Sequence, residues 1–89
     1  RELFLFSPDQ QTVHRIKEIS DQILEDYSFT PIFYDIARTG RKMWISIYFR
    51  PDTDMISVKN IQNINRILNE QLGKEFQNIS CEIIPDTHN

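Results

Sequence analysis

FTPIFYDIARTGRKMWISIYF, residues 29–49, is the stretch that decides the fold. β-Branched and aromatic residues dominate positions 29–36, and a second run of them covers positions 42–49. The segment Arg38-Thr39-Gly40-Arg41 lies between the two runs and provides a turn that contains a glycine. The stretch therefore predicts a β-hairpin. In its second strand the side chains alternate between a face of Met43, Ile45, Ile47 and Phe49 and a face of Trp44, Ser46 and Tyr48.

Amphipathic helices are predicted on both sides of the hairpin. Ser7-Pro8-Asp9 is a strong helix start, because serine caps free backbone N–H groups and proline fits the first helical position. A helix over residues 8–25 follows. Pro51 ends the second strand, and capping residues in 52–57 open a second helix that Gly73 closes. The apolar stripes of the two helices are Val13, Ile16, Ile19, Ile23 and Leu24, and Val58, Ile61, Ile64, Leu68 and Leu72.

A last strand is predicted over residues 78–84, and Pro85-Asp86 ends it. The resulting order of helix, strand, strand, helix, strand predicts a single α+β domain. Both helices are expected to cover one face of a three-stranded sheet, which gives an α-β-β-α-β sandwich. The last strand presents Ile79, Cys81 and Ile83 to the helices and Ser80, Glu82 and Ile84 to the other side.

The sheet face without helices is expected to be unusually apolar. Trp44, Tyr48 and Ile84 fall on it, and bulges in the first strand decide whether Ile32, Tyr34 and Ile36 join them. A monomer rarely exposes so much apolar surface, and two-fold pairing lets one patch cover itself. We therefore expect a homodimer. The residues predicted for its interface are Tyr34, Trp44, Tyr48 and Ile84.

Composition excludes several classes of function. The net charge of −3 disfavours nucleic-acid binding. The longest apolar run near the start, Leu3-Phe4-Leu5-Phe6, is far shorter than the roughly 20 residues of a transmembrane helix.

The chain starts at Arg1 rather than at methionine, so we expect a fragment of a longer protein. The single cysteine, Cys81, fits a reducing compartment such as the cytoplasm.

The residues suggest no catalytic residue and no enzyme activity. Cys81 points toward the expected core and has no nearby histidine to serve as its base. The only glycines, Gly40 and Gly73, lie at a turn and at a helix end, so no phosphate-binding loop is present. Asp86 and His88 are two positions apart near the end of the chain, a spacing that suits a divalent metal when other ligands complete the shell.

The motifs together resemble a known family. They are Tyr34-Asp35-Ile36-Ala37-Arg38-Thr39-Gly40 before the second strand, Pro51-Asp52 after it, Ser57-Val58 opening a helix, and Ile83-Ile84-Pro85 closing the last strand. In this order they resemble the C-terminal cytoplasmic domain of the cation diffusion facilitator, or cation efflux, transporters.

The resemblance implies a fold, partners and a location. In that family the domain has a ferredoxin-like, metallochaperone-like fold and forms a homodimer below the membrane domain of the same polypeptide, on the cytoplasmic side of the cell (inner) membrane. Divalent metal at the dimer interface modulates transport of zinc, cobalt, cadmium, iron or manganese. Residues 1–7 would be the linker from the membrane domain, residues 8–86 the cytoplasmic domain and residues 87–89 a flexible tail.

The resemblance also indicates that the usual ligand set is changed. Where many members have histidines, this chain has Tyr34, Tyr48 and Gln62, and the position of the ligand in the last strand holds Glu82. A phenol with a pKa of about 10 is a poor ligand for zinc. We therefore expect a divergent branch that requires no cofactor and binds zinc at most weakly. The metal candidates are Glu82, Asp86 and His88.

Two other interpretations stay open. The chain is alternatively a free-standing ferredoxin-like module that senses a ligand or binds a protein through Tyr34, Trp44 and Tyr48. The other is a small enzyme with an acylphosphatase-like arrangement, since this fold class hosts many chemistries. It is the least supported interpretation, because the sequence has no phosphate-binding loop and no convergent catalytic pair.

Overall fold

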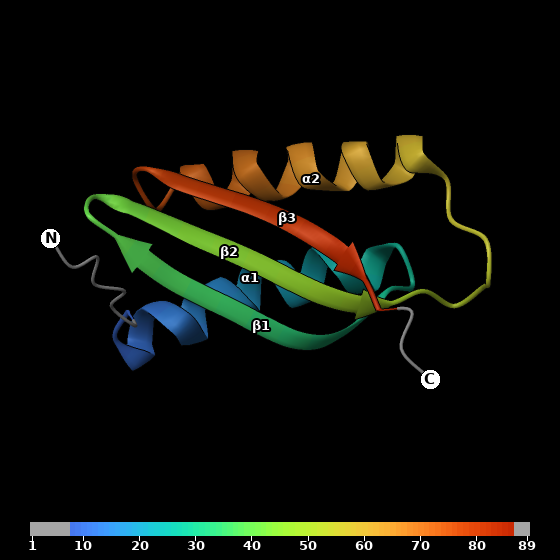
Figure 1. Ribbon diagram of the computed structural model, residues 1–89, viewed down its shortest axis with the longest axis horizontal. Coiled ribbons are helices and arrows are strands. Elements are labelled where there is room, and N and C mark those ends of the chain that lie inside the picture. The colour runs from blue at the N-terminus through green and yellow to red at the C-terminus, as the bar shows by residue number, and fades with distance from the viewer. Residues whose placement is uncertain (1–7, 87–89) are drawn as a thin grey trace, which may run out of the picture.

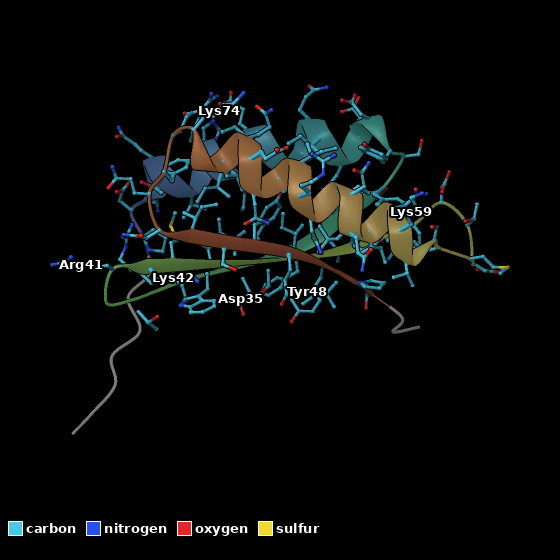
Figure 2. The ribbon with its side chains drawn as sticks, turned by 90° about the horizontal axis from the view of Figure 1, so that it is seen from above. Asp35, Arg41, Lys42, Tyr48, Lys59 and Lys74 are labelled. Carbon is cyan, nitrogen blue, oxygen red and sulfur yellow. The ribbon has the colours of Figure 1, made fainter. Side chains whose placement is uncertain are left out.

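The computed structural model describes residues 8–86, and both the expected linker, 1–7, and the expected tail, 87–89, lie outside this range. The order of elements is α1, β1, β2, α2 and β3, as predicted. The helices lie together on one side of the sheet (Figures 1 and 2). The bounds are Gln10–Asp26 for α1, Thr30–Thr39 for β1, Lys42–Arg50 for β2, Val58–Gly73 for α2 and Ile79–Pro85 for β3.

Side-chain caps fix where both helices begin. At α1 the cap is Asp9, whose Oδ1 accepts a hydrogen bond from the backbone N–H of Thr12 at 2.8 Å. The helix therefore begins two residues later than the Ser7-Pro8 signal predicted. At α2 the cap is Ser57, whose Oγ accepts from the backbone N–H of Asn60 at 3.3 Å. Each cap satisfies one of the free N–H groups at a helix start.

The sheet is mixed, in the order β1-β2-β3. β1 pairs with β2 in an antiparallel hairpin, and β2 pairs with β3 in parallel. The hairpin turn is tighter than predicted, because the strands run to Thr39 and from Lys42 and leave only Gly40 and Arg41 between them. Gly40 has φ +60, a left-handed conformation that glycine adopts without strain.

The core lies between the sheet and the two helices. As predicted, the alternate residues of β2 and β3 face it, and most residues of the two helix stripes close it. Val58, which was predicted in the stripe of α2, is instead 70% exposed, because it is the first residue of the helix. Phe29 joins them from the turn after α1 and stacks on Phe49, with ring centroids 4.5 Å apart. The buried apolar residues are Ile16, Leu24, Phe29, Met43, Ile45, Ile47, Phe49, Ile64, Leu68, Leu72, Cys81 and Ile83.

The prediction that Tyr34 belongs to the uncovered face and its dimer interface is wrong, and Ile36, whose face the sequence left open, does not lie there either. The register of β1 shifts between Pro31 and Phe33, so Tyr34 pairs with Ile47 and Ile36 pairs with Ile45. Since these partners in β2 are buried beneath the helices, Tyr34 and Ile36 lie on the helix-covered face and pack against the core. The physical reason is the extra residue at the bulge, which moves every following side chain of β1 to the opposite face.

Two asparagines of α2 cover the outer edge of β3. The Asn69 amide donates to the carbonyl of Cys81 at 2.8 Å and accepts from the N–H of Cys81 at 2.9 Å. Asn65 accepts from the N–H of Ile83 at 2.9 Å through its Oδ1. These side chains occupy backbone groups that another strand would otherwise bond, so they close this edge of the sheet.

Candidate functional site: the uncovered sheet face

The sheet face opposite the helices is the candidate site. Figure 2 shows Asp35 and Tyr48 pointing away from the helices on this side. The register arranges its side chains in three rows across the strands. The rows are Phe33, Tyr48 and Ile84; Asp35, Ser46 and Glu82; and Ala37, Trp44 and Ser80.

The first row is apolar and partly exposed. Phe33 is 59% exposed, and its ring lies 5.9 Å from the ring of Tyr48 between centroids, at an interplanar angle of 47°. Tyr48 and Ile84 are half-buried beside it. Ring pairs of this spacing attract one another, which gives the row a fixed shape. The row offers a preformed apolar surface for another molecule.

Trp44 is held in place within the third row. Its indole Nε1 donates to Oγ1 of Thr39 at 2.6 Å, and the Nζ of Lys42 lies 4.5 Å from its ring centroid. The side chain nevertheless stays 45% exposed. A fixed, exposed indole loses little conformational entropy on contact, so it is well suited to anchor an interface.

A carboxylate row separates the two apolar rows. Asp35 and Glu82 are exposed on either side of Ser46, with one strand between them. Two strand spacings place their Cα atoms about 10 Å apart. A cation between them would need ligands from a further molecule, because two carboxylates at this separation form only part of a coordination shell.

The predicted metal candidates do not come together. Glu82 lies in the middle of β3, and Asp86 follows its end, about 13 Å further along the strand direction. The backbone N–H of Asp86 donates to the carbonyl of Phe49 at 2.8 Å. His88 lies outside the described residues. Within residues 8–86 no group of three or more histidine, cysteine, aspartate or glutamate side chains could hold a metal.

The three residues at the family's histidine positions are spread over the molecule. Tyr48 is on the uncovered face, Tyr34 on the helix-covered face, and Gln62 on the exposed side of α2. The phenol of Tyr34 donates to Oδ1 of Asp21 in α1 at 2.5 Å. Burial of the ring, together with the Asp21 carboxylate, raises the pKa of Tyr34 above its ordinary value. This phenol therefore stays protonated and tied to α1.

Cys81 is buried, as predicted, on the core face of β3. Burial raises the pKa of its thiol to about 12, and the charge of Glu82 adds to the effect. A thiol that stays protonated at neutral pH is a weak nucleophile and a weak metal ligand. Its place in the core gives it a packing role.

The sequence analysis did not place three residues of β1 on this face: Phe33, Asp35 and Ala37. All three reach it because of the bulge before Phe33. The available signal was Pro31, since proline inside a strand often marks a bulge or an edge. The same pattern does not tell which residue is the extra one, and that residue decides the face.

Of the comparisons with known proteins, only the one with solved structures gives matches. No protein-family model matches the sequence, and no curated protein matches it. Among solved structures, a cadmium form of a MamM CTD variant matches with a TM-score of 0.59 at 14% identity, covering 90% of this chain and 98% of that one. A nickel form of another variant matches with a TM-score of 0.60 at 14% identity, covering 91% of this chain and 100% of that one.

The chain has the fold of the MamM C-terminal domain. The match runs over nearly the whole of both chains, so the ferredoxin-like α-β-β-α-β order is common to the two from end to end. The MamM fold therefore confirms the architecture that the sequence predicted. At 14% identity the likeness concerns the fold and not the residues of the uncovered face.

Proposed function

We propose that this chain is the cytoplasmic regulatory and dimerisation domain of a divalent metal cation transporter of the cation diffusion facilitator type. The MamM C-terminal domain is itself a cytoplasmic domain of that family. Its fold, together with the motifs from Tyr34 to Gly40 and from Ile83 to Pro85, supports the assignment. In this proposal the domain catalyses no reaction, and transport of zinc, cobalt or a similar ion takes place in the membrane domain.

The observation that carries the proposal is the uncovered sheet face. Its apolar rows, which contain Phe33, Tyr48 and Ile84 on one side and Trp44 on the other, have helices only behind them. A second copy placed on this face by a two-fold axis would bury both sets of rows at once. We therefore propose that Phe33 takes the place predicted for Tyr34 in a homodimer interface with Trp44, Tyr48 and Ile84.

The carboxylate row gives the interface a regulatory element. Two-fold pairing would bring Asp35 and Glu82 of one copy toward the same residues of the other, and four carboxylates repel one another unless a cation lies between them. Divalent cations at such an interface would act on the dimer rather than on a single chain. The proposal does not require a bound metal, because the apolar rows supply contact area without one.

Sedimentation of the 89-residue chain tests the dimer, first with chelator and then with added zinc. We expect a dimer at micromolar concentration in both conditions. Phe33→Lys should shift the chain to monomer, because it places a charge in the apolar row. Val58→Lys is the matched control: Val58 is 70% exposed on α2, away from the sheet face, and its substitution should leave the dimer intact.

The alternatives predict other results. A monomer in both conditions would contradict the dimer and favour the free-standing ligand-sensing or protein-interaction module. A dimer that forms only with zinc would assign the main role to the carboxylate row.

No helix within residues 8–86 is long and apolar enough to cross a membrane.

A further inference from the structure

Basic side chains gather at one end of the molecule. Arg38 is the second-last residue of β1, Arg41 lies in the turn, Lys42 is the first residue of β2, and Lys74 follows the last residue of α2. Figure 2 shows Arg41, Lys42 and Lys74 at this end and Lys59 at the opposite one. We call the four residues Arg38, Arg41, Lys42 and Lys74 the basic end.

Three carboxylates of the first helix region and of the segment after α2 are already engaged. Both oxygens of Glu75 accept from Arg15, at 2.8 and 2.6 Å, and Glu18 also accepts from Arg15 at 2.8 Å. Asp9 caps α1. Within residues 8–86 no ion pair joins a carboxylate to any residue of the basic end. Their positive charge is therefore available to an external anion.

Neighbouring uncharged side chains hold two residues of the basic end without neutralising them. Nη2 of Arg38 lies 3.9 Å from Sδ of Met43, and the ammonium of Lys42 lies over the Trp44 ring. An open hollow of about 530 Å³ lies beside them and is lined by Arg38, Arg41, Glu75, Phe76, Gln77 and Asn78, with Gly40 and Met43. The two guanidinium groups and the amides around this hollow suit the oxygens of a phosphate ester, and the Glu75 carboxylate that also lines it is held by Arg15.

The opposite end of the domain carries mostly acidic side chains. Asp26 ends α1, Asp52 and Asp54 lie in the loop between β2 and α2, and Asp86 follows β3. Arg50 and Lys59 are the basic residues closest to them in sequence. Since the whole chain has a net charge of −3, the basic end is a local feature and not a consequence of overall composition. An anionic surface would attract one end of the domain and repel the other.

We propose that the basic end docks on the anionic phospholipid headgroups of the cytoplasmic membrane leaflet. This inference rests on the proposed function, in which a membrane domain precedes residue 8. The start of α1 lies at the same end of the molecule as the turn between β1 and β2 (Figure 1). A chain that comes from the bilayer into α1 thus brings the basic end to the headgroups and leaves the acidic end in the aqueous phase.

The expected strength is that of a weak electrostatic contact. Each basic residue near an anionic leaflet increases binding about fivefold, and the effect falls off within a Debye length. Four such residues suffice to orient a domain that is already tethered to the membrane. The same contact weakens as salt rises, which distinguishes it from insertion of apolar side chains.

The test is co-sedimentation of the 89-residue chain with vesicles at low ionic strength. Vesicles of phosphatidylcholine with phosphatidylserine are compared with vesicles of phosphatidylcholine alone. We expect binding to the anionic vesicles only. The double variant Arg41→Gln, Lys74→Gln should lower it about 25-fold. The control Arg50→Gln, Lys59→Gln changes the net charge equally at the opposite end and should bind as the unmodified chain does.

Three results would overturn the inference. They are equal binding to both kinds of vesicle, equal loss of binding in the two double variants, and binding of inorganic phosphate to the basic end without binding to vesicles. A chain that dimerises in sedimentation but ignores anionic vesicles would lose this inference alone. A monomer that still binds them through the basic end would contradict the dimer and support the docking surface.

Discussion

At the scale of single residues, Tyr34 shows how one side chain joins two elements. Its ring lies on the helix-covered face of β1, and its phenol donates to Asp21 of α1. The resemblance to cation diffusion facilitators placed it at a ligand position. The structure instead places it in a contact between helix and sheet, which a deprotonated phenol would break.

This contact predicts how stability depends on pH. Burial, and then Asp21, hold the pKa of Tyr34 above its ordinary value of 10.0. The contribution of Tyr34 is therefore fully present below pH 10 and is lost above it, because only the unfolded chain then releases the proton. We expect the free energy of unfolding to fall less steeply between pH 10 and 11 in Tyr34→Phe than in the unmodified chain.

Urea unfolding at several alkaline pH values measures this difference. Cys81 contributes a loss of the same sign, from its ordinary pKa of 9.0 up to about 12, but it is present in both proteins and cancels in the comparison. Parallel curves for the two proteins would mean that the Tyr34 phenol titrates equally in the folded and unfolded chains.

At the scale of elements, the contact between α2 and β3 depends on two asparagines rather than on apolar residues alone. Asn69 bonds both backbone groups of Cys81, and it also donates to the carbonyl of Asn65 at 2.7 Å. β3 is an edge strand, and an open edge invites pairing with other chains. Polar side chains of α2 thus bond backbone groups of β3 that a neighbouring strand would otherwise bond.

We expect Asn69→Ala to destabilise the domain by about 2 kcal/mol, because it leaves the N–H and the carbonyl of Cys81 without their partner. Gln62→Ala is the matched control: it removes the same kind of amide from an exposed position of α2 and should change stability by at most about 0.5 kcal/mol. Urea unfolding at one fixed protein concentration gives both values. Equal effects would show that the amide bonds to β3 contribute nothing.

At the scale of the whole molecule, the response to zinc separates a constitutive dimer from a metal-dependent one. Within residues 8–86, no cluster of ligands is complete in one chain. For weak binding, with a dissociation constant near the zinc concentration of about 0.1 mM, the melting temperature should rise by no more than about 3 °C. Calorimetry with chelator and then with zinc measures the shift.

A rise of about 10 °C or more would contradict weak binding and reveal a site that forms between copies. Glu82→Gln and Asp35→Asn would then locate it: loss of the shift in both variants assigns the carboxylate row, and retention in both assigns another part of the chain. Asp86→Asn and His88→Ala test the two remaining candidates from the sequence.

The sequence by itself determined the order and type of the five elements. Alternation from Met43 to Phe49 and the helical spacing of Ile64, Leu68 and Leu72 are local patterns whose period follows from backbone geometry. They also predicted the buried residues of β2, α2 and β3, except that Val58 at the start of α2 is exposed. The helix boundaries were less exact, since Asp9 rather than Ser7 caps α1.

Only the tertiary structure decided which side chains of β1 belong to the uncovered face. One extra residue between Pro31 and Phe33 changes the face of every later position, so Phe33 and Asp35 replaced Tyr34 and Ile36 there. The cover that Asn69 gives to β3 and the grouping of Arg41 with Lys74 likewise join positions far apart in the chain. Local periodicity in the sequence reveals the type of each helix or strand, because the spacing of its side chains follows from backbone geometry. Strand register and contacts between elements depend instead on how the whole chain packs.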